Sequence, residues 1–273
     1  MQITRETKYI LGSVLSLGIS FSALLAHIFS SPSLPWVYNH NATPFFANKL
    51  MLSIYIGIEY LSFLSMNIPL LLLGDQVNDF TFSIIHSSIW YNILFVLTII
   101  LFVREKLYWT ALLSLFLFST AFTMYSQSLR LRNGVIEMLT MKFPSKLVFG
   151  KALWFVVYAF SAAVHCRSIG CRVFSNVFIW FVAILYLAPI LGFHDWALSL
   201  ISAYLFGAIG VGQLFIHLFA LQHIFAFIIC GLMILFAVLL FFLPYRQRRA
   251  SLTGESAPLL QNDSGSTPAG NAV

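Results

Sequence analysis

Residues 80–103 read FTFSIIHSSIWYNILFVLTIILFV, and after Arg104-Glu105-Lys106 residues 107–126 continue LYWTALLSLFLFSTAFTMYS. Neither run contains a charged side chain. A helix needs about 20 apolar residues to cross the hydrocarbon core of a bilayer. Within lipid every backbone amide must be paired inside its own segment, so runs of this length are helices rather than isolated strands. The short charged connection therefore predicts an antiparallel pair of membrane-spanning helices.

Similar apolar runs recur along the rest of the chain. We expect spans near residues 9–29, 49–73, 80–103, 107–126, 150–166, 173–193, 197–218 and 221–243. A second tight connection is His194-Asp195-Trp196. The break within 197–243 is the least marked, so seven spans is the alternative to eight. The sequence predicts an all-α fold, a polytopic transmembrane helical bundle of about eight spans over residues 1–243.

The composition supports a lipid environment. Of 273 residues, 60% are hydrophobic and 9% are charged, against about 25% charged in a typical soluble domain. Such a chain has too little polar surface to cover a water-soluble globule. Its net charge of +6 comes from basic residues scattered through short connections. Nucleic-acid binding needs a basic patch, so we expect the lipid bilayer, and no nucleic acid, as the partner.

The distribution of Lys and Arg predicts an orientation, because cytoplasmic loops carry an excess of both. With eight spans, one side holds Arg5, Lys8, Arg130, Arg132, Lys142, Lys146, Lys151, Arg246, Arg248 and Arg249, and the other holds Lys49, Arg104, Lys106, Arg167 and Arg172. Both termini are therefore predicted to be cytoplasmic. Residues 244–273 are rich in Ser, Thr, Gly and Pro and are predicted to form a disordered cytoplasmic tail.

Two short motifs lie in this tail. Ser251 follows Arg248-Arg249-Ala250, a spacing that basophilic kinases favour, and is a candidate phosphorylation site. Glu255, Leu259 and Leu260 resemble an acidic dileucine sorting signal, which cytoplasmic adaptor proteins bind. This signal favours a vacuolar, endosomal or Golgi membrane over the endoplasmic reticulum and the plasma membrane. Chance is the alternative, because such short motifs arise readily in disordered tails.

Glu59 is the one acidic residue well inside a predicted span. A charge at mid-bilayer costs about 2.5–3.5 kcal/mol on insertion scales, so it usually faces protein or water. At helical spacing Glu59 shares a face with Tyr55, Ser62 and Met66. His86 lies in the next span, so we predict that Glu59, Ser62 and His86 face one cavity that relays protons or binds a cation. The structural alternative is a neutral Glu59 that hydrogen-bonds a neighbouring helix.

Three features concern the predicted non-cytoplasmic side and helix packing. Cys166 and Cys171 bracket a tight loop where a disulfide would be stable in an oxidising compartment; an incomplete metal site or two unlinked residues are the alternatives. Asn41-Ala42-Thr43 is an N-glycosylation acceptor triplet. Gly207 and Gly210 have the spacing that lets helices approach closely.

Motifs of catalysis are absent from the sequence. It has no Gly-x-Ser-x-Gly elbow, no His-Glu-x-x-His, no phosphate loop and no paired carboxylates. The glycines around residue 210 follow no strand and do not form a dinucleotide fingerprint. We therefore expect a protein that is not an enzyme and that has no cofactor and no metal site.

Several stretches resemble a fungal family of uncharacterised multi-spanning membrane proteins. They are residues 36–39 with 43–45, residues 175–180, and residues 210–213 with 219–227, and the similarity covers most of 1–243. The resemblance implies a fungal endomembrane protein and assigns no activity. Our first hypothesis is a structural or accessory role in an internal membrane. The second is a small-solute or cation/proton-coupled transporter or channel that uses Glu59, and a lipid-modifying enzyme is the least supported.

Overall fold

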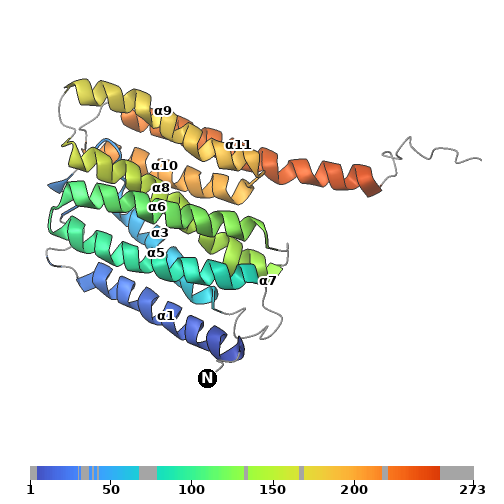
Figure 1. Ribbon diagram of the computed structural model, residues 1–273. Coiled ribbons are helices and arrows are strands. Elements are labelled where there is room, and N and C mark those ends of the chain that lie inside the picture. The colour runs from blue at the N-terminus through green and yellow to red at the C-terminus, as the bar shows by residue number, and fades with distance from the viewer. Residues whose placement is uncertain are drawn as a thin grey trace, which may run out of the picture.

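The computed structural model describes residues 5–29, 31, 37–38, 40–41, 43–67, 79–131, 135–165, 169–216 and 221–252. Every regular element in these residues is helical, which confirms the all-α class (Figure 1). The helices are α1 (Arg5–Phe29), α3 (Lys49–Ser65), α5 (Asp79–Val103), α6 (Leu107–Leu129), α7 (Val135–Glu137), the π-helix η2 (Met138–Lys142), α8 (Phe143–Ala163), α9 (Ile169–Gly192), α10 (Trp196–Ile216) and α11 (Gln222–Leu252).

Seven described helical segments are long and apolar enough to cross a membrane. They are Leu11–Phe29, Thr81–Val103, Leu107–Leu129, Val135–Ala163, Val173–Gly192, Trp196–Leu214 and Gln222–Phe242. Helix α3 is shorter, at 17 residues. It runs antiparallel to α8: Phe45, just before α3, meets Trp154, and Tyr55 meets Leu147. The protein is thus a multi-pass helical bundle with seven to eight spans.

The two ends of the bundle are distinct. We call the end that holds Asn48 and the 104–106 turn the Asn48 end, and the end that holds the 194–195 turn the Asp195 end. Glu105 and His194 adopt φ values of 54° and 52°, which close the two tight hairpins that the sequence predicts. Helix α1 begins and α11 ends on the same side of the bundle (Figure 1).

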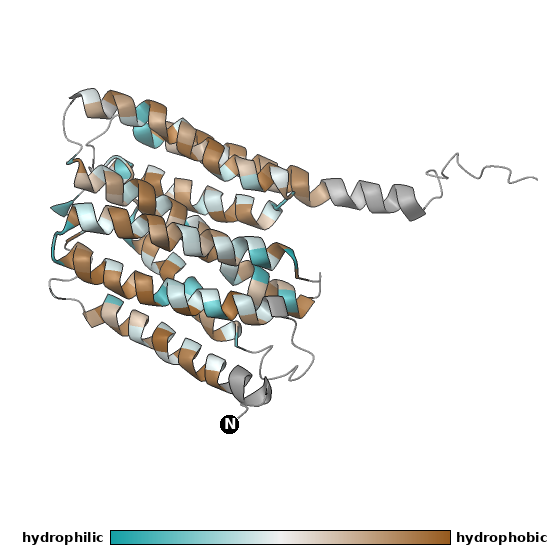
Figure 2. Ribbon diagram, viewed as in Figure 1, coloured by the Kyte–Doolittle hydropathy of each residue, from teal (hydrophilic) through white to brown (hydrophobic). Residues whose placement is uncertain are grey.

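Hydrophobic residues, drawn in brown, predominate along the helices (Figure 2), and many large ones are exposed on the outside of the bundle. Large side chains such as Phe21 on α1, Phe174 on α9 and Phe242 on α11 are about 60% exposed. Polar residues are instead buried between helices. Ser20 on α1 accepts a hydrogen bond from Asn92 on α5, and Ser16 lies 3.5 Å from Ser88. A surface of this kind matches lipid rather than water.

Three helix bounds differ from those predicted. The helical structure that leads into the fifth span begins at Val135 rather than at 150. Its π-helix, η2, ends two residues before Pro144, which has no amide hydrogen to donate to the preceding turn. Helix α3 ends at Ser65 rather than 73, and Pro69 has no amide hydrogen for the Ser65 carbonyl. Helix α11 continues to Leu252, past the domain limit predicted at 243.

The start of α3 is fixed to α10 by close backbone contacts. The Asn48 amide donates to the Ala208 carbonyl at 2.7 Å, and the Gln213 side chain donates to the Thr43 carbonyl at 2.9 Å. A Cβ on Gly212 would lie 2.6 Å from the Phe46 carbonyl oxygen. Asn48 also caps α3 by accepting hydrogen bonds from its first amides. These contacts set the position of α3 and therefore of Glu59.

Candidate functional site

A buried ion pair joins α3 to α8. Lys151 Nζ lies 2.6 Å from Glu59 Oε2, and the two side chains are only 4% and 1% exposed. Glu59 is on the α3 face predicted from helical spacing, because Tyr55, Ser62 and Met66 are also buried. Lys151 comes from the middle of α8, so both charges lie well inside spans.

Aromatic residues of α5 complete the surroundings of the pair. The Tyr91 hydroxyl donates to Glu59 Oε1 at 3.3 Å. The Lys151 ammonium lies 3.9 Å from the centroid of the Phe95 ring and 5.5 Å from that of Tyr91. Ring faces attract a cation, and this attraction grows when water is excluded. The carboxylate therefore has a hydroxyl and an ammonium as partners, and the ammonium has a carboxylate and two rings.

Such a pair is costly to bury. The penalty for taking each ion out of water is several kcal/mol, and the mutual attraction roughly offsets it only in good geometry. Apolar side chains of similar volume would pack in the same place without that penalty. Ionisable groups inside spans are for this reason typical of functional sites. The Glu59–Lys151 pair is the candidate site on these grounds.

A cavity of about 90 Å³ borders the cationic side of the pair. Lys151 forms part of the cavity wall. Lys49, the first residue of α3, also lines the cavity, so the cavity lies toward the Asn48 end of the bundle. The remaining lining residues are His27, Tyr38, Leu52, Ser53, Ile56, Phe95, Ile99, Phe102, Trp154 and Phe155. The Nδ1 atom of His27 is buried and has no hydrogen-bond partner among the described residues. The site thus combines an apolar, aromatic wall with a few basic groups.

The two predicted companions of Glu59 take other positions. His86 is exposed and accepts a hydrogen bond from Trp90 Nε1 at 3.1 Å, on a different face of α5 from Tyr91. The Ser62 hydroxyl donates to the Ile58 carbonyl of its own helix at 2.7 Å. His86 therefore does not lie beside Glu59, and Tyr91 occupies the place expected of His86. A binding role for Glu59, Ser62 and His86 stays a prediction.

Lys151 is the residue of the candidate site that the sequence did not identify. The predicted fifth span, 150–166, begins beside Lys151, and the count of Lys and Arg places this lysine with Lys142 and Lys146 on the cytoplasmic side. Glu59 gives the one indication of such a residue, because a carboxylate inside the membrane usually pairs with a basic side chain. Lys151 stands next to Ala152-Leu153-Trp154-Phe155, an apolar run that continues to Ala163.

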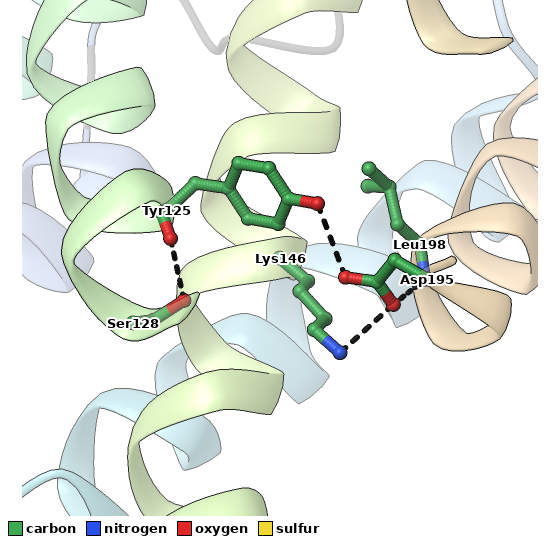
Figure 3. A network of polar contacts seen from close by, with 5 residues as sticks. All are labelled: Tyr125, Ser128, Lys146, Asp195 and Leu198. Atoms are coloured by element: carbon green, nitrogen blue, oxygen red, sulfur yellow. Dashed lines mark hydrogen bonds and ion pairs between the residues drawn. The ribbon is translucent and has the colours of Figure 1, made fainter. Parts of the chain in front are cut away.

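A second ionic network closes the Asp195 end (Figure 3). Asp195 Oδ1 lies 2.8 Å from Lys146 Nζ and accepts from the Leu198 amide at 3.1 Å, so Asp195 caps α10. The Tyr125 hydroxyl donates to Asp195 Oδ2 at 3.1 Å. These contacts join α6, α8 and α10. The Lys146–Asp195 pair stands outside the wall of the Lys151 cavity and serves as an internal comparison for the Glu59–Lys151 pair.

A second cavity of about 380 Å³ lies on the other side of α3. Tyr55 and Ile58 of α3 face it, together with Lys146 of α8, Tyr204 of α10 and the π-helix η2. Ser53 and Ile56 of α3 face the Lys151 cavity instead. Helix α3 therefore separates two cavities, and the Glu59–Lys151 contact holds α3 against α8 between them.

The remaining predicted sites are placed as follows. Cys171 is disulfide-bonded and Cys230 is a free thiol, while Cys166 lies outside the described residues. Asn41 donates through its side chain to the Val37 carbonyl at 3.0 Å, and Thr43 is buried; glycosylation of Asn41 stays a prediction. The Ser251 backbone belongs to α11, whereas Glu255, Leu259 and Leu260 lie outside the described residues.

Gly207 and Gly210 pack within the chain. A Cβ on Gly210 would lie 2.9 Å from the Phe227 ring of α11, and one on Gly207 would be 3.5 Å from Cys230 Sγ. The predicted packing role is confirmed, and its partner is α11. Among the described residues there is also no group of three or more His, Cys, Asp or Glu side chains placed to hold a metal ion.

Comparison with known proteins gives the family. A family model described as a fungal protein of unknown function matches residues 172–260. An uncharacterised protein of Schizosaccharomyces pombe is 76% identical over 263 residues, which cover 96% of this chain and 98% of that protein. The chain belongs to this fungal family. The resemblance drawn from the sequence is confirmed, and the family match extends into the tail as far as residue 260. No solved structure matches this family member.

Proposed function

We propose that the protein is a carrier of small solutes in an internal membrane, and that the Glu59–Lys151 pair is its working group. The observation that carries this proposal is the cavity whose wall includes one partner of a fully buried ion pair. Transport requires a polar group that a solute reaches from one end of the bundle. Lys151 lines the cavity and contacts Glu59 directly, so a charged solute bound beside Lys151 would act on Glu59 as well.

The arrangement around α3 supports a carrier. One cavity lies on the side of Ser53 and Ile56, and the other on the side of Tyr55 and Ile58. Alternating access needs an element that moves between two such spaces around a central site. Helix α3, at 17 residues, is shorter than each of the seven described membrane-length segments, and it is tied to α10 mainly near its first residues. A tilt of α3 about this attachment would close one cavity and open the other.

An accessory role without transport is the second candidate. The observation that favours it is the backbone of α11, which extends past the other helices of the bundle (Figure 1). Neither candidate includes a catalytic step. The two differ in one respect that is measurable: a carrier exposes its central cavity to both ends of the bundle in turn, whereas an accessory protein has no need to do so.

We predict that a cysteine in the Lys151 cavity reacts with a membrane-impermeant thiol reagent from both ends. The variant is Ser53→Cys in a Cys230→Ser background, which removes the thiol that the structure shows free. Labelling is measured in vesicles of each orientation. Lys106→Cys, in the 104–106 turn, is the matched control and should react only from the Asn48 end.

Labelling of Ser53→Cys from the Asn48 end alone would favour the accessory role. Labelling of Lys106→Cys from both ends would reveal leaky vesicles, and the vesicles would be prepared again until the control reacts from one end. The comparison of the two variants therefore separates movement of the protein from leakage of the reagent.

We further propose that both termini are cytoplasmic and that the tail addresses the protein to a vacuolar, endosomal or Golgi membrane. The common side of the α1 start and the α11 end supports placing the termini together. Three arginines follow the membrane part of α11, at 246, 248 and 249, and such charges favour the cytoplasm. Phosphate on Ser251 would weaken the attraction of these arginines to anionic lipids.

Replacement of Leu259 and Leu260 by Ala is expected to move the protein to a different membrane. An adaptor that binds the acidic dileucine signal needs both apolar side chains, with Glu255 in a basic pocket. Fluorescence microscopy of the tagged full-length chain measures the location. A double variant at Asn262 and Asp263 is the control, and an unchanged location of the Leu variant would reject the sorting signal.

A further inference from the structure

We infer that the Lys151 cavity takes an apolar monocarboxylate, and that Glu59 accepts one proton for each carboxylate bound. This inference rests on the proposed function and names its solute. It draws on the charges that line the cavity, on the apolar nature of its walls, and on the fact that Lys151 has a buried carboxylate as its only ionic partner among the described residues.

The charges of the lining favour an anion. Its basic residues are His27, Lys49 and Lys151, and the lining contains no Asp or Glu. Glu59 lies behind Lys151, so a solute in the cavity meets the ammonium first. A cationic solute would meet two lysines at short range in a poorly hydrated space, where repulsion is strong. A carboxylate would instead form a charge-assisted hydrogen bond with Lys151.

The walls select a solute with an apolar body. Phe95, Phe102, Trp154 and Phe155 supply aromatic surface, and Leu52 and Ile56 supply aliphatic surface. A sugar or a polyol would lose hydrogen bonds to water here and regain few, at a cost of about 1–3 kcal/mol for each unpaired group. His27 belongs to this lining, and its buried Nδ1 has no hydrogen-bond partner among the described residues. A single acidic head group on an apolar body satisfies these constraints.

The balance of charge requires a proton. In the unliganded pair, the ammonium of Lys151 offsets the carboxylate of Glu59. A second carboxylate beside Lys151 would give these three groups a net charge of about −1, and Lys49, which is exposed at the mouth of the cavity, offsets that charge only in part. If Glu59 is protonated as the solute binds, the site holds the solute carboxylate, the ammonium and a neutral Glu59, and its net charge is again zero. The proton comes from water or with the acid, and no other bond changes.

Few other titratable groups lie on the elements packed around Glu59. On α5, Tyr91 donates to Glu59 Oε1 and suits either protonation state, because it can bond the remaining oxygen of a neutral carboxyl group. On α1, His27 lines the cavity and titrates near neutral pH in ordinary surroundings. The other titratable neighbours are Tyr55 and Tyr60 on α3, Lys151 on α8 and, at the mouth, Tyr38 and Lys49. His27 is therefore the one competitor that the experiment must separate.

The test measures binding to the full-length protein in nanodiscs. Radiolabelled benzoate is the probe, and benzamide and benzylammonium carry the same ring with a neutral or a positive head. We expect benzoate to bind, and we expect an excess of neither analogue to displace it. We also expect uptake of about one proton per benzoate in weakly buffered solution, and an affinity that falls about tenfold for each pH unit between pH 6 and 8.

Two variants assign the proton. In Glu59→Gln the affinity for benzoate should not depend on pH and proton uptake should vanish, whereas in His27→Gln both should persist. Loss of the pH dependence in His27→Gln with its retention in Glu59→Gln would overturn the assignment to Glu59. The wild-type measurements need no variant, so they decide the stoichiometry even where a variant does not fold.

The outcomes separate this inference from the carrier proposal. Binding of benzylammonium or benzamide in place of benzoate would overturn the carboxylate, while two-sided labelling of Ser53→Cys would still support a carrier. Binding of benzoate without proton uptake would overturn the coupling. A competition experiment with oleate distinguishes the source of the carboxylate. Displacement of benzoate by low concentrations of oleate supports a carboxylate that enters from the membrane. Failure of oleate to displace benzoate supports a carboxylate that enters from water.

Discussion

Replacement of Lys151 by Met is expected to destabilise the protein by about 3–5 kcal/mol, because it leaves the Glu59 carboxylate buried without its partner. Glu59→Gln should also be destabilising, since it leaves the ammonium of Lys151 unpaired. The double variant Glu59→Gln/Lys151→Met carries no charge at the site and should lose less stability than either single variant. Thermal unfolding in detergent, followed by tryptophan fluorescence, measures the three differences.

The Lys146–Asp195 pair supplies the matched control. The Lys146 side chain is 11% exposed, against 4% for Lys151, so more water reaches it. Lys146→Met should therefore cost less than Lys151→Met, and Asp195→Asn should keep the cap of α10, because Asn is also a good N-cap residue. Additive effects of the Glu59 and Lys151 substitutions would show that the two side chains do not form a pair.

The second large effect is expected at Gly212. A Cβ at this position would lie 2.6 Å from the Phe46 carbonyl oxygen and 2.7 Å from both the Ala47 carbonyl carbon and the Asn48 amide nitrogen. These atoms belong to the backbone, so they cannot rotate away as a side chain would. Gly212→Ala should destabilise the protein by about 3 kcal/mol, at the upper end of the range for overpacked cores. The same unfolding measurement checks it.

Gly231 is the control for this substitution, because a Cβ there would have no neighbour within 4 Å. Gly231→Ala in α11 should be neutral or stabilising by up to about 1 kcal/mol, the gain in helix propensity. Equal unfolding temperatures for the two alanine variants would mean that α10 and the start of α3 are not in contact. Displacement of that start would also move Glu59, so Gly212→Ala should weaken benzoate binding as well.

Much of the fold was predictable because a segment that crosses lipid must be a long apolar helix with its backbone groups paired internally. The charged turn Arg104-Glu105-Lys106 and the turn at His194-Asp195 marked two hairpins, and the structure closes both with a left-handed residue. The α3 face that holds Glu59 also followed from helical spacing, since a helix fixes which residues share a face. The start of α8 did not follow, because Lys142 and Lys146 lower the hydropathy of the residues before 150, although both lysines are buried in the structure.

The partners of Glu59 were not predictable in the same way. Helix α5 is apolar on most of its circumference, so its sequence does not fix the rotation that brings Tyr91 rather than His86 to α3. Lys151 is distant in sequence from Glu59, and only the packing of α8 against α3 brings them together. Tight contacts such as that of Gly212 depend on the path of residues 43–48, for which the sequence holds no periodic signal.

The most direct test of the carrier proposal is the labelling of Ser53→Cys from each side of the membrane, with Lys106→Cys as the control. We predict that Ser53→Cys reacts from both the Asn48 end and the Asp195 end, while Lys106→Cys reacts from the Asn48 end only. Reaction of both cysteines from the Asn48 end alone would contradict the proposal that α3 opens the Lys151 cavity to the two sides in turn.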